Sequence, residues 1–393
     1  MRLKQNFVMI IILALLLGSI CLGATTIKEE DNEPVIPDDE PVVDVIPDDF
    51  CKEVNNADGI PTEVIDVIKN YMNDYFLSIY TLEQQDTSKY FISDVDAKIS
   101  NAAIKLLVES RKLYDFDFTM SDAHYVLNVT NHSNDGDNYK IGFLEDDSFS
   151  FKFLNGITSE SYDIENSITI KKENDEYRIA EFEKVQGYYM MFSDNRDENI
   201  DEIYDFYFNR LKNVIEDENY KKDLAAQNPY VEKKTYSVKY NREAASNYVE
   251  MYCHNRNDAY YDFSDEGGNC QNLSSQALVA GGMVMDESGD CEWYYYDHLD
   301  YVPSWVHVES FNDYCKDNDG SGLVCVVNEN IYYAEPGDII QVGISSISHT
   351  TMVSKVVDGH ILLNSNSIDM KDFPLEAYTY PVRKLIKILG SNS

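Results

Sequence analysis

The spacing of apolar residues changes along the first half of the chain, and this change restricts the fold more than any other feature. Over residues 61–82 apolar residues recur at steps of three and four, which predicts an amphipathic helix that starts at Pro61. A second, weaker helix is expected over 94–113. From Tyr114 onward apolar and polar residues alternate, as in half-buried strands. Helices followed by several strands favour an α+β fold.

The strands of this first half are expected to be short. Strand-like runs lie near residues 125–129, 139–144, 149–154, 166–171 and 177–182. Clusters of Asn and Asp, such as NHSNDGDN, are turn signals that separate them. We therefore expect a small α+β accessory domain over residues 56–190, in which no residue points to catalysis.

The C-terminal half repeats the mixture of helices and strands. Amphipathic helices are predicted at about 198–216 and at 240–252. Residues 339–342, 349–356 and 360–363 predict three strands joined by short loops. We expect residues 191–236 to connect the halves and residues 237–393 to form a second α+β domain.

The first residues are typical of an export signal. Arg2 and Lys4 precede an almost wholly apolar run, so residues 1–24 are expected to be a signal peptide or, if uncut, a membrane anchor. Residues 25–55 are acidic, contain proline and lack a helical period, which predicts a disordered linker. The protein is thus expected to be secreted or held on the outer face of the membrane of a bacterium. Low Arg and abundant Asn, Asp, Lys and Tyr agree with a Gram-positive source.

The charge of the chain excludes one class of partner. There are 70 acidic and 32 basic residues, and the formal net charge is −38. Nucleic acids are excluded, because their phosphates need clustered Lys and Arg. The charge also opposes docking on anionic lipid, so contact with a membrane is expected only through residues 1–24. Nothing in the sequence indicates an oligomeric state.

One cysteine has a setting suited to nucleophilic catalysis. Gly267 and Gly268 predict a tight turn, and Cys270 follows where a helix should begin. A thiol in the first turn of a helix feels the positive end of its dipole, which lowers the pKa and favours the thiolate. Cys270 is therefore the candidate nucleophile. The alternative is a buried structural thiol or one half of a disulfide.

A histidine further along the chain is the candidate general base. His349 lies at the start of the middle strand of the C-terminal set, next to a short loop. Papain-like hydrolases bring a cysteine on a helix and a histidine on a facing antiparallel strand into contact. We therefore predict that Cys270 and His349 lie close together. The alternative for His349 is a polar residue at a strand end.

Seven short motifs follow one another along the second half of the chain. They are YNREAA at 240–245, GGNCQNLSSQ at 267–276, GG at 281–282, WYY at 293–295, SW at 304–305, PGD at 336–338 and HT at 349–350. On these motifs, residues 238–385 resemble the bacterial putative amidase domain, a papain-like cysteine hydrolase family related to NlpC-type cell-wall peptidases. The resemblance implies a fold in which a cysteine-bearing helix packs on an antiparallel sheet, and cleavage of an amide bond in a peptide or cell-wall peptide.

The resemblance also implies a third polar residue that orients the imidazole. Asn366 is the first candidate and Asp369 the second, and the family usually has His at the place of Asn366. An orienting residue need only accept a hydrogen bond from the ring N–H. This sequence also departs from the family at Asn269, Gln271 and Leu273, where the family has Asp, Thr and an aromatic residue.

The remaining site candidates would bind the substrate. Gln276, Asn272 and Asn269 are candidate donors to the oxyanion, together with the backbone N–H of the nucleophile. Trp293 and Trp305 are candidates to line a substrate groove, with core packing as the alternative.

Two other interpretations remain open from the sequence. In the first, the departures from the family pattern mark a cell-surface binding or structural module that has kept the fold and lost the chemistry. In the second, Cys253, His254, Cys270 and His349 bind a metal ion. The metal site is disfavoured because no Cys-x-x-Cys or His-Glu-x-x-His motif is present in the sequence. We therefore expect no metal and no cofactor.

Overall fold

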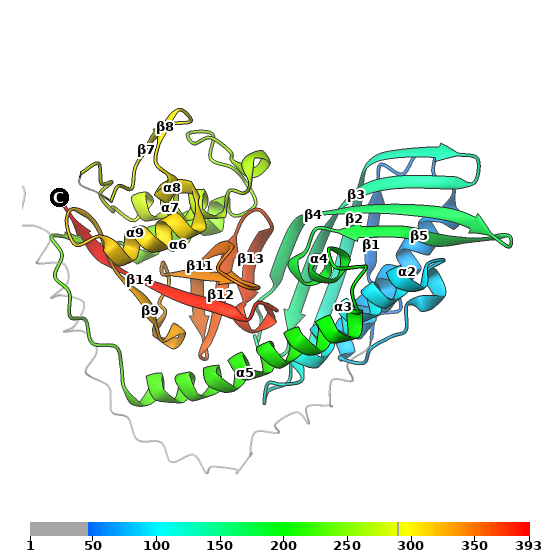
Figure 1. Ribbon diagram of the computed structural model, residues 1–393, viewed down its shortest axis with the longest axis horizontal. Helices are drawn as coiled ribbons and strands as arrows, with labels where there is room; N and C mark the ends of the chain where they lie inside the picture. Colours follow the sequence, from blue (N-terminus) through cyan, green and yellow to red (C-terminus); the bar gives the residue numbers. More distant parts are fainter. Residues whose placement is uncertain (1–45, 289–290) are drawn as a thin grey trace, which may run out of the picture. The chain divides into compact units, whose positions relative to one another are not determined.

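The computed structural model describes residues 46–288 and 291–393. The expected signal or anchor segment, residues 1–24, and most of the expected linker lie outside these residues. In the part that is described, no helix is both long and apolar enough to cross a membrane. The chain has a mixed α+β structure, with a large and mostly antiparallel sheet and eight α-helices in these described ranges (Figure 1).

The helices and strands expected in the first half are confirmed. Helices α2 (Thr62–Thr81) and α3 (Asp94–Arg111) match the predicted ranges closely. The strands are longer than expected: β2 (Met120–Asp135), β3 (Asn138–Phe151), β4 (Ser159–Glu173) and β5 (Glu176–Lys184). Buried and less buried residues alternate along β3, so one face of the sheet is covered.

Three boundaries in this half differ from the prediction. Residues 51–55, assigned to the linker, form β1 (Cys51–Asn55), because their backbone pairs in parallel with β2. The Asn-rich segment after Val129 belongs to β2, since its backbone pairs with β3 up to the turn at Gly136. The alternating stretch from Tyr114 becomes a strand only at Met120.

The second half also contains the predicted elements. Helix α5 (Ile200–Gln227) runs further than expected, while α6 (Arg242–Tyr252), β10 (Ile339–Gly343), β11 (His349–Val357) and β12 (His360–Ser365) agree with the prediction. The other elements are α4 (Gly187–Ser193), β6 (Val238–Lys239), α7 (Cys270–Ala280), β7 (Tyr295–Asp297), β8 (Asp300–Tyr301), α8 (Pro303–Val306), α9 (Val308–Asp317), β9 (Gly322–Glu329), β13 (Asp369–Pro374) and β14 (Val382–Asn392).

A single sheet of 12 strands runs through both halves. Its main order is β1-β2-β3-β4-β13-β12-β11-β10-β14-β6, and β5 and β9 pair with β4 and β14. The halves join where β13 pairs antiparallel with β4, with Asp369 opposite Tyr162 and Lys371 opposite Glu160. The hydroxyl of Ser159 adds a bond of 2.7 Å to the carbonyl of Asp372.

The strands of the second half have apolar residues on both faces. Ile339 and Met352 belong to a core that includes residues of α6, α7 and α9. Their neighbours Ile340 and Val353 belong to a second core, which they share with residues of the first half. Helix α7 therefore covers one face of the sheet beside α6 and α9 (Figure 1).

Candidate functional site

The predicted nucleophile begins a helix, as expected. Cys270 is the first residue of α7. The preceding Gly267 and Gly268 have φ angles of 108° and 122°, a conformation that side-chain-bearing residues rarely adopt. These glycines turn the chain sharply, so that the first backbone N–H groups of α7 are directed at the thiol.

Buried amides hold the turn before Cys270 in place. The backbone N–H of Asn269 donates to the hydroxyl of Ser367 at 2.7 Å. The side-chain oxygen of Asn269 accepts a hydrogen bond from the side-chain amide of Asn272 at 2.6 Å. The Asn272 amide also donates to the carbonyl of Tyr261 and accepts from the indole N–H of Trp305. Asn269 and Asn272, two candidate oxyanion donors, thus support the fold of the turn.

The structure brings the helix start and the histidine strand together. The backbone N–H of Thr350, the residue after His349, faces the Cys270 thiol and lowers its pKa. The Thr350 hydroxyl donates to the side-chain oxygen of Gln271 at 3.0 Å. The two candidate catalytic residues therefore lie at adjoining positions. No hydrogen bond links their side chains directly within the described residues.

Burial decides the electrostatics of this pair. Cys270 is 6% exposed, and burial raises the pKa of its thiol, although the N–H groups of Thr350, Gln271 and Cys270 itself lower it. The expectation that the helix start lowers the thiol pKa is therefore wrong on balance, because loss of water outweighs the dipole. His349 is only half-buried by its exposed surface, but the packing around its imidazole lowers the pKa of the ring to about 4. A neutral imidazole beside a neutral thiol can accept its proton.

Asn366, the first candidate for the third polar residue, lies near the start of the strand that carries His349. It follows β12, and the pairing of Met352 with Asn364 carries the chain after Asn364 alongside the start of β11. Asn366 is 1% exposed, and its side-chain oxygen has no hydrogen-bond partner among the described residues. An unpaired buried acceptor is costly, so this oxygen is available for an N–H donor.

The carboxylate of Asp369 is already occupied. Its two oxygens accept from the guanidinium of Arg256 at 2.9 and 3.0 Å, and one also accepts from the backbone N–H of Ser367. Asp369 thus fixes the turn that follows Asn366, and both of its carboxylate oxygens already have partners.

The substrate-binding candidates have different surroundings. Gln276 accepts from the Tyr248 hydroxyl at 2.8 Å and lines a small cavity with Asn269 and Asn366. The prediction that Trp293 and Trp305 line a groove is wrong. Both indoles are 0% exposed and stack on each other with centroids 5.1 Å apart, because they fill the core around α7.

Some residues at the site were not predicted from the sequence. Tyr380 lies near Cys270, because Cys270 contributes to the raised pKa of the Tyr380 phenol. Tyr380 also lines two cavities. Arg256 holds Asp369 from the loop after α6. Neither has a local sequence signal, because each acts through a distant partner. In the sequence Thr350 belongs only to the motif HT at 349–350, which gives it no role of its own.

One cluster has the geometry of a metal site. Ligand atoms of Asp163, His254 and Asp369 lie within 4.8 Å of one another. The bidentate bond from Arg256 already supplies a positive charge to Asp369, which opposes a second cation there. This cluster shares only His254 with the four ligands considered from the sequence.

The candidate site lies within the part of the chain that matches a known family model. Residues 239–388 match the family model described as "Putative amidase domain", which indicates a hydrolase. The chain is also similar to "Uncharacterized protein YhbB" of Bacillus subtilis (strain 168), with 32% identity over 142 residues. That similarity covers 34% of this chain and 44% of the relative, so the chain matches less than half of that protein's length. No solved structure matches.

Proposed function

We propose that the protein is a cysteine-dependent hydrolase of amide bonds with a papain-like arrangement of its active site. The observation that supports this proposal is that the backbone N–H of Thr350 faces the Cys270 thiol, so that Cys270 lies beside the strand that begins at His349. The match to an amidase family supports the reaction class.

The proposed reaction is acyl transfer through the thiol. His349 takes the proton of Cys270, and the sulfur attacks the carbonyl carbon of the amide. Backbone N–H groups at the start of α7 stabilise the oxyanion, and His349 returns its proton to the departing amine. Water, deprotonated by His349, then attacks the thioester, which releases the acid and restores the thiol. Asn366 accepts a hydrogen bond from the other ring N–H and so positions the imidazole.

The substrate and location are part of the proposal. A peptide or cell-wall peptide is the proposed substrate, and residues 1–24 are proposed to direct export to the outside of the cell or to its membrane. The apolar run in those residues supports export.

A second candidate function is a binding module that has lost catalysis. The burial and raised pKa of the Cys270 thiol favour it, because a thiol that stays protonated is a poor nucleophile. The place of Asn366, where the family usually has histidine, favours it too.

Limited alkylation separates the two functions. Brief treatment with iodoacetamide near neutral pH, read by mass spectrometry, is expected to label Cys270 before Cys51, a half-buried thiol whose pKa burial also raises. Replacing His349→Ala should slow the labelling of Cys270 about tenfold, because the thiol loses its base, and leave Cys51 unchanged. If Cys270 stays unlabelled while Cys51 reacts, the binding module is the better explanation. If it is labelled first, amide substrates can be screened against Cys270→Ala.

A further inference from the structure

A groove lies beside the strand that begins at His349. The loop between β10 and β11 lines it, and the loop residue Ser348 directly precedes His349. A backbone hydrogen bond of 2.9 Å from the Ser348 N–H to the carbonyl of Val342 holds this loop in place. Tyr380, which lies near Cys270, lines the same groove. The groove therefore adjoins the two candidate catalytic residues.

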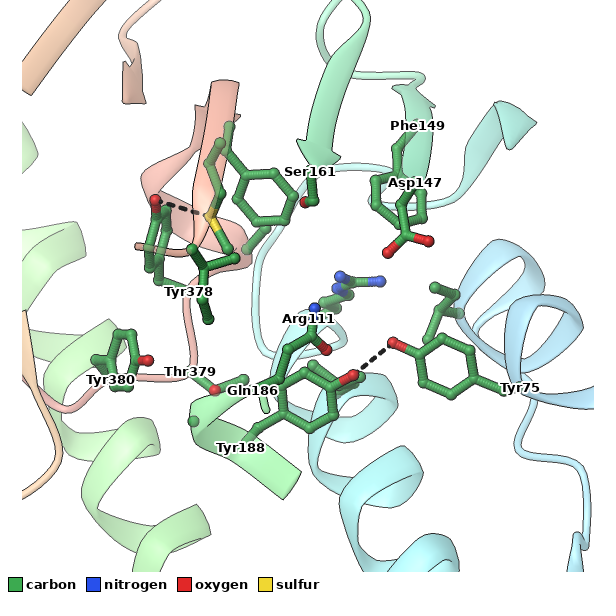
Figure 2. Close-up of a pocket in the computed structure, with 17 residues that line it drawn as sticks. Tyr75, Arg111, Asp147, Phe149, Ser161, Gln186, Tyr188, Tyr378, Thr379 and Tyr380 are labelled. Atoms are coloured by element: carbon green, nitrogen blue, oxygen red, sulfur yellow. Dashed lines mark hydrogen bonds between the residues drawn. The ribbon is translucent and has the colours of Figure 1, made fainter. Parts of the chain in front are cut away.

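The first half of the chain supplies another wall of this groove. Helix α4 contributes Met190, and α5 contributes Tyr207. Residues 378–380 pass the start of α4, where Tyr380 contacts Gly187 (Figure 2). A Cβ atom at Gly187 would lie 2.8 Å from a ring carbon of Tyr380, so this close contact requires glycine. Both halves of the chain therefore shape the groove.

The groove is large enough for part of a peptide. It encloses about 410 Å³, and pockets that bind small molecules span about 300–1,000 Å³. A second hollow of about 330 Å³ shares Asn195 and Tyr207 with the groove, so the two adjoin each other. An extended ligand can therefore occupy both.

The lining combines apolar side chains with carboxylates. Met190 in the groove and Phe206 in the second hollow are both exposed, at 39% and 59%. Asp194 lines the groove, and Glu198 and Glu202 line the second hollow. These three carboxylates are exposed, and none of them forms an ion pair in the described part of the chain. They are therefore available to a ligand.

The charge of the lining selects the kind of ligand. No lysine or arginine is among the described residues that line the groove or the second hollow. Arg210 lies 5.6 Å from the centroid of the Phe206 ring, so one guanidinium stands against three carboxylates. A lysine or arginine side chain, with its apolar stem and cationic end, matches such a lining. An acidic side chain would be repelled.

We propose that the groove binds the substrate peptide on one side of the scissile amide, with a lysine or arginine side chain of the substrate directed at Asp194. The stem of that side chain lies against Met190 and Tyr207, and Glu198 and Glu202 attract further basic residues of the peptide. This proposal rests on the proposed function, because it takes the groove beside the candidate catalytic residues as part of the active site. The first half of the chain then determines specificity.

Calorimetric titration at low ionic strength tests the proposal on the whole protein with Cys270→Ala, which can bind a peptide without cleaving it. The probes are three acetylated and amidated pentapeptides, each with two alanines on either side of a central lysine, norleucine or glutamate. We expect the lysine peptide to bind about tenfold more tightly than the norleucine peptide, which has the same stem without the charge. The glutamate peptide should bind most weakly.

Variants of one carboxylate separate the groove from the overall negative charge of the protein. Added to Cys270→Ala, Asp194→Asn should weaken binding of the lysine peptide about threefold, because one exposed charge pair is lost, and leave the norleucine peptide unchanged. Asp197→Asn is the control, since it removes an exposed carboxylate outside the described lining and should change neither peptide. Asp194→Lys should strengthen binding of the glutamate peptide, a gain that a folding defect cannot produce.

Three results would overturn the proposal: no binding of any peptide at millimolar concentration, equal binding of the lysine and norleucine peptides, or equal effects of Asp194→Asn and Asp197→Asn. They are distinct from a failure of the proposed function, which alkylation of Cys270 detects. A groove that prefers lysine beside an unreactive Cys270 would keep the inferred specificity and reject the hydrolase. A reactive Cys270 without this preference would do the reverse.

Discussion

At the scale of the residue, burial sets the chemistry of the candidate site more than charge does. No charged side chain contributes to the pKa of His349, and the three N–H groups around the Cys270 thiol do not outweigh its loss of water. Both groups are therefore neutral before reaction, and the proton must move from sulfur to nitrogen as the bond forms. This differs from a site that holds a preformed ion pair.

The titration of His349 should be visible in protein stability. Its folded pKa of about 4 lies below the ordinary histidine value of 6.5, so the unfolded chain takes up the proton first as the pH falls. The neutral ring contributes stability above about pH 6.5, and this contribution is lost between about pH 6.5 and pH 4. As the pH is lowered through this range, we expect the melting temperature of His349→Gln to fall less than that of the wild type.

Thermal unfolding at several pH values measures this difference. His132→Gln, which alters an exposed histidine, is the control and should follow the wild type. A gap between wild type and His349→Gln that stays constant with pH would show that the imidazole is not buried in its neutral form.

At the scale of the element, the turn between β12 and β13 joins several parts of the site. It carries Asn366 and supplies the hydroxyl of Ser367 to the turn before α7. Its far end is fixed by the bidentate bond between Asp369 and Arg256. The position of Asn366 therefore depends on an ion pair formed by a distant loop.

Breaking that ion pair should loosen the turn. Asp369→Asn keeps the size of the side chain and removes its charge, and we expect a loss of about 2 kcal/mol in the free energy of unfolding, because charge-assisted hydrogen bonds are lost. Denaturation in urea measures this change in the free energy of unfolding. Asp163→Asn removes an exposed carboxylate from the same cluster, and its effect should stay within about 0.5 kcal/mol. Equal losses in the two variants would argue against an anchoring role for Asp369.

At the scale of the whole molecule, the continuous sheet makes the two halves depend on each other. β13 pairs with β4, and one hydrophobic core contains residues from both halves. Val342 and Leu363 of the second half share this core with Phe118 and Phe151 of the first. Removing either half would expose a large apolar face.

A truncated chain tests this dependence. Residues 237–393 alone are expected to bind a hydrophobic dye and to lack a sharp thermal transition, because the face that carries Val342 loses its cover. Residues 46–393 should unfold in one cooperative step. A sharp transition in the short chain would instead mark residues 237–393 as an independent domain.

Local sequence patterns predicted most of the elements and supplied the two candidate residues Cys270 and His349. The helical spacing over 61–82 and the glycine turn before Cys270 each reflect contacts between residues near in sequence, so they can be predicted without the fold. The motif order then pointed to His349. Strand ends were less accurate, because backbone pairing extends strands past their apolar pattern, as in β2.

Only the tertiary structure decided how these parts meet. The pairing of β13 with β4, the approach of the Thr350 N–H to the Cys270 thiol and the burial of Trp293 each depend on residues far apart in the chain. The burial of Arg111 is a further case, since in the sequence it is an ordinary residue at the end of a helix. Burial and partnership are properties of the packed chain, and they set the pKa of Cys270 and of His349.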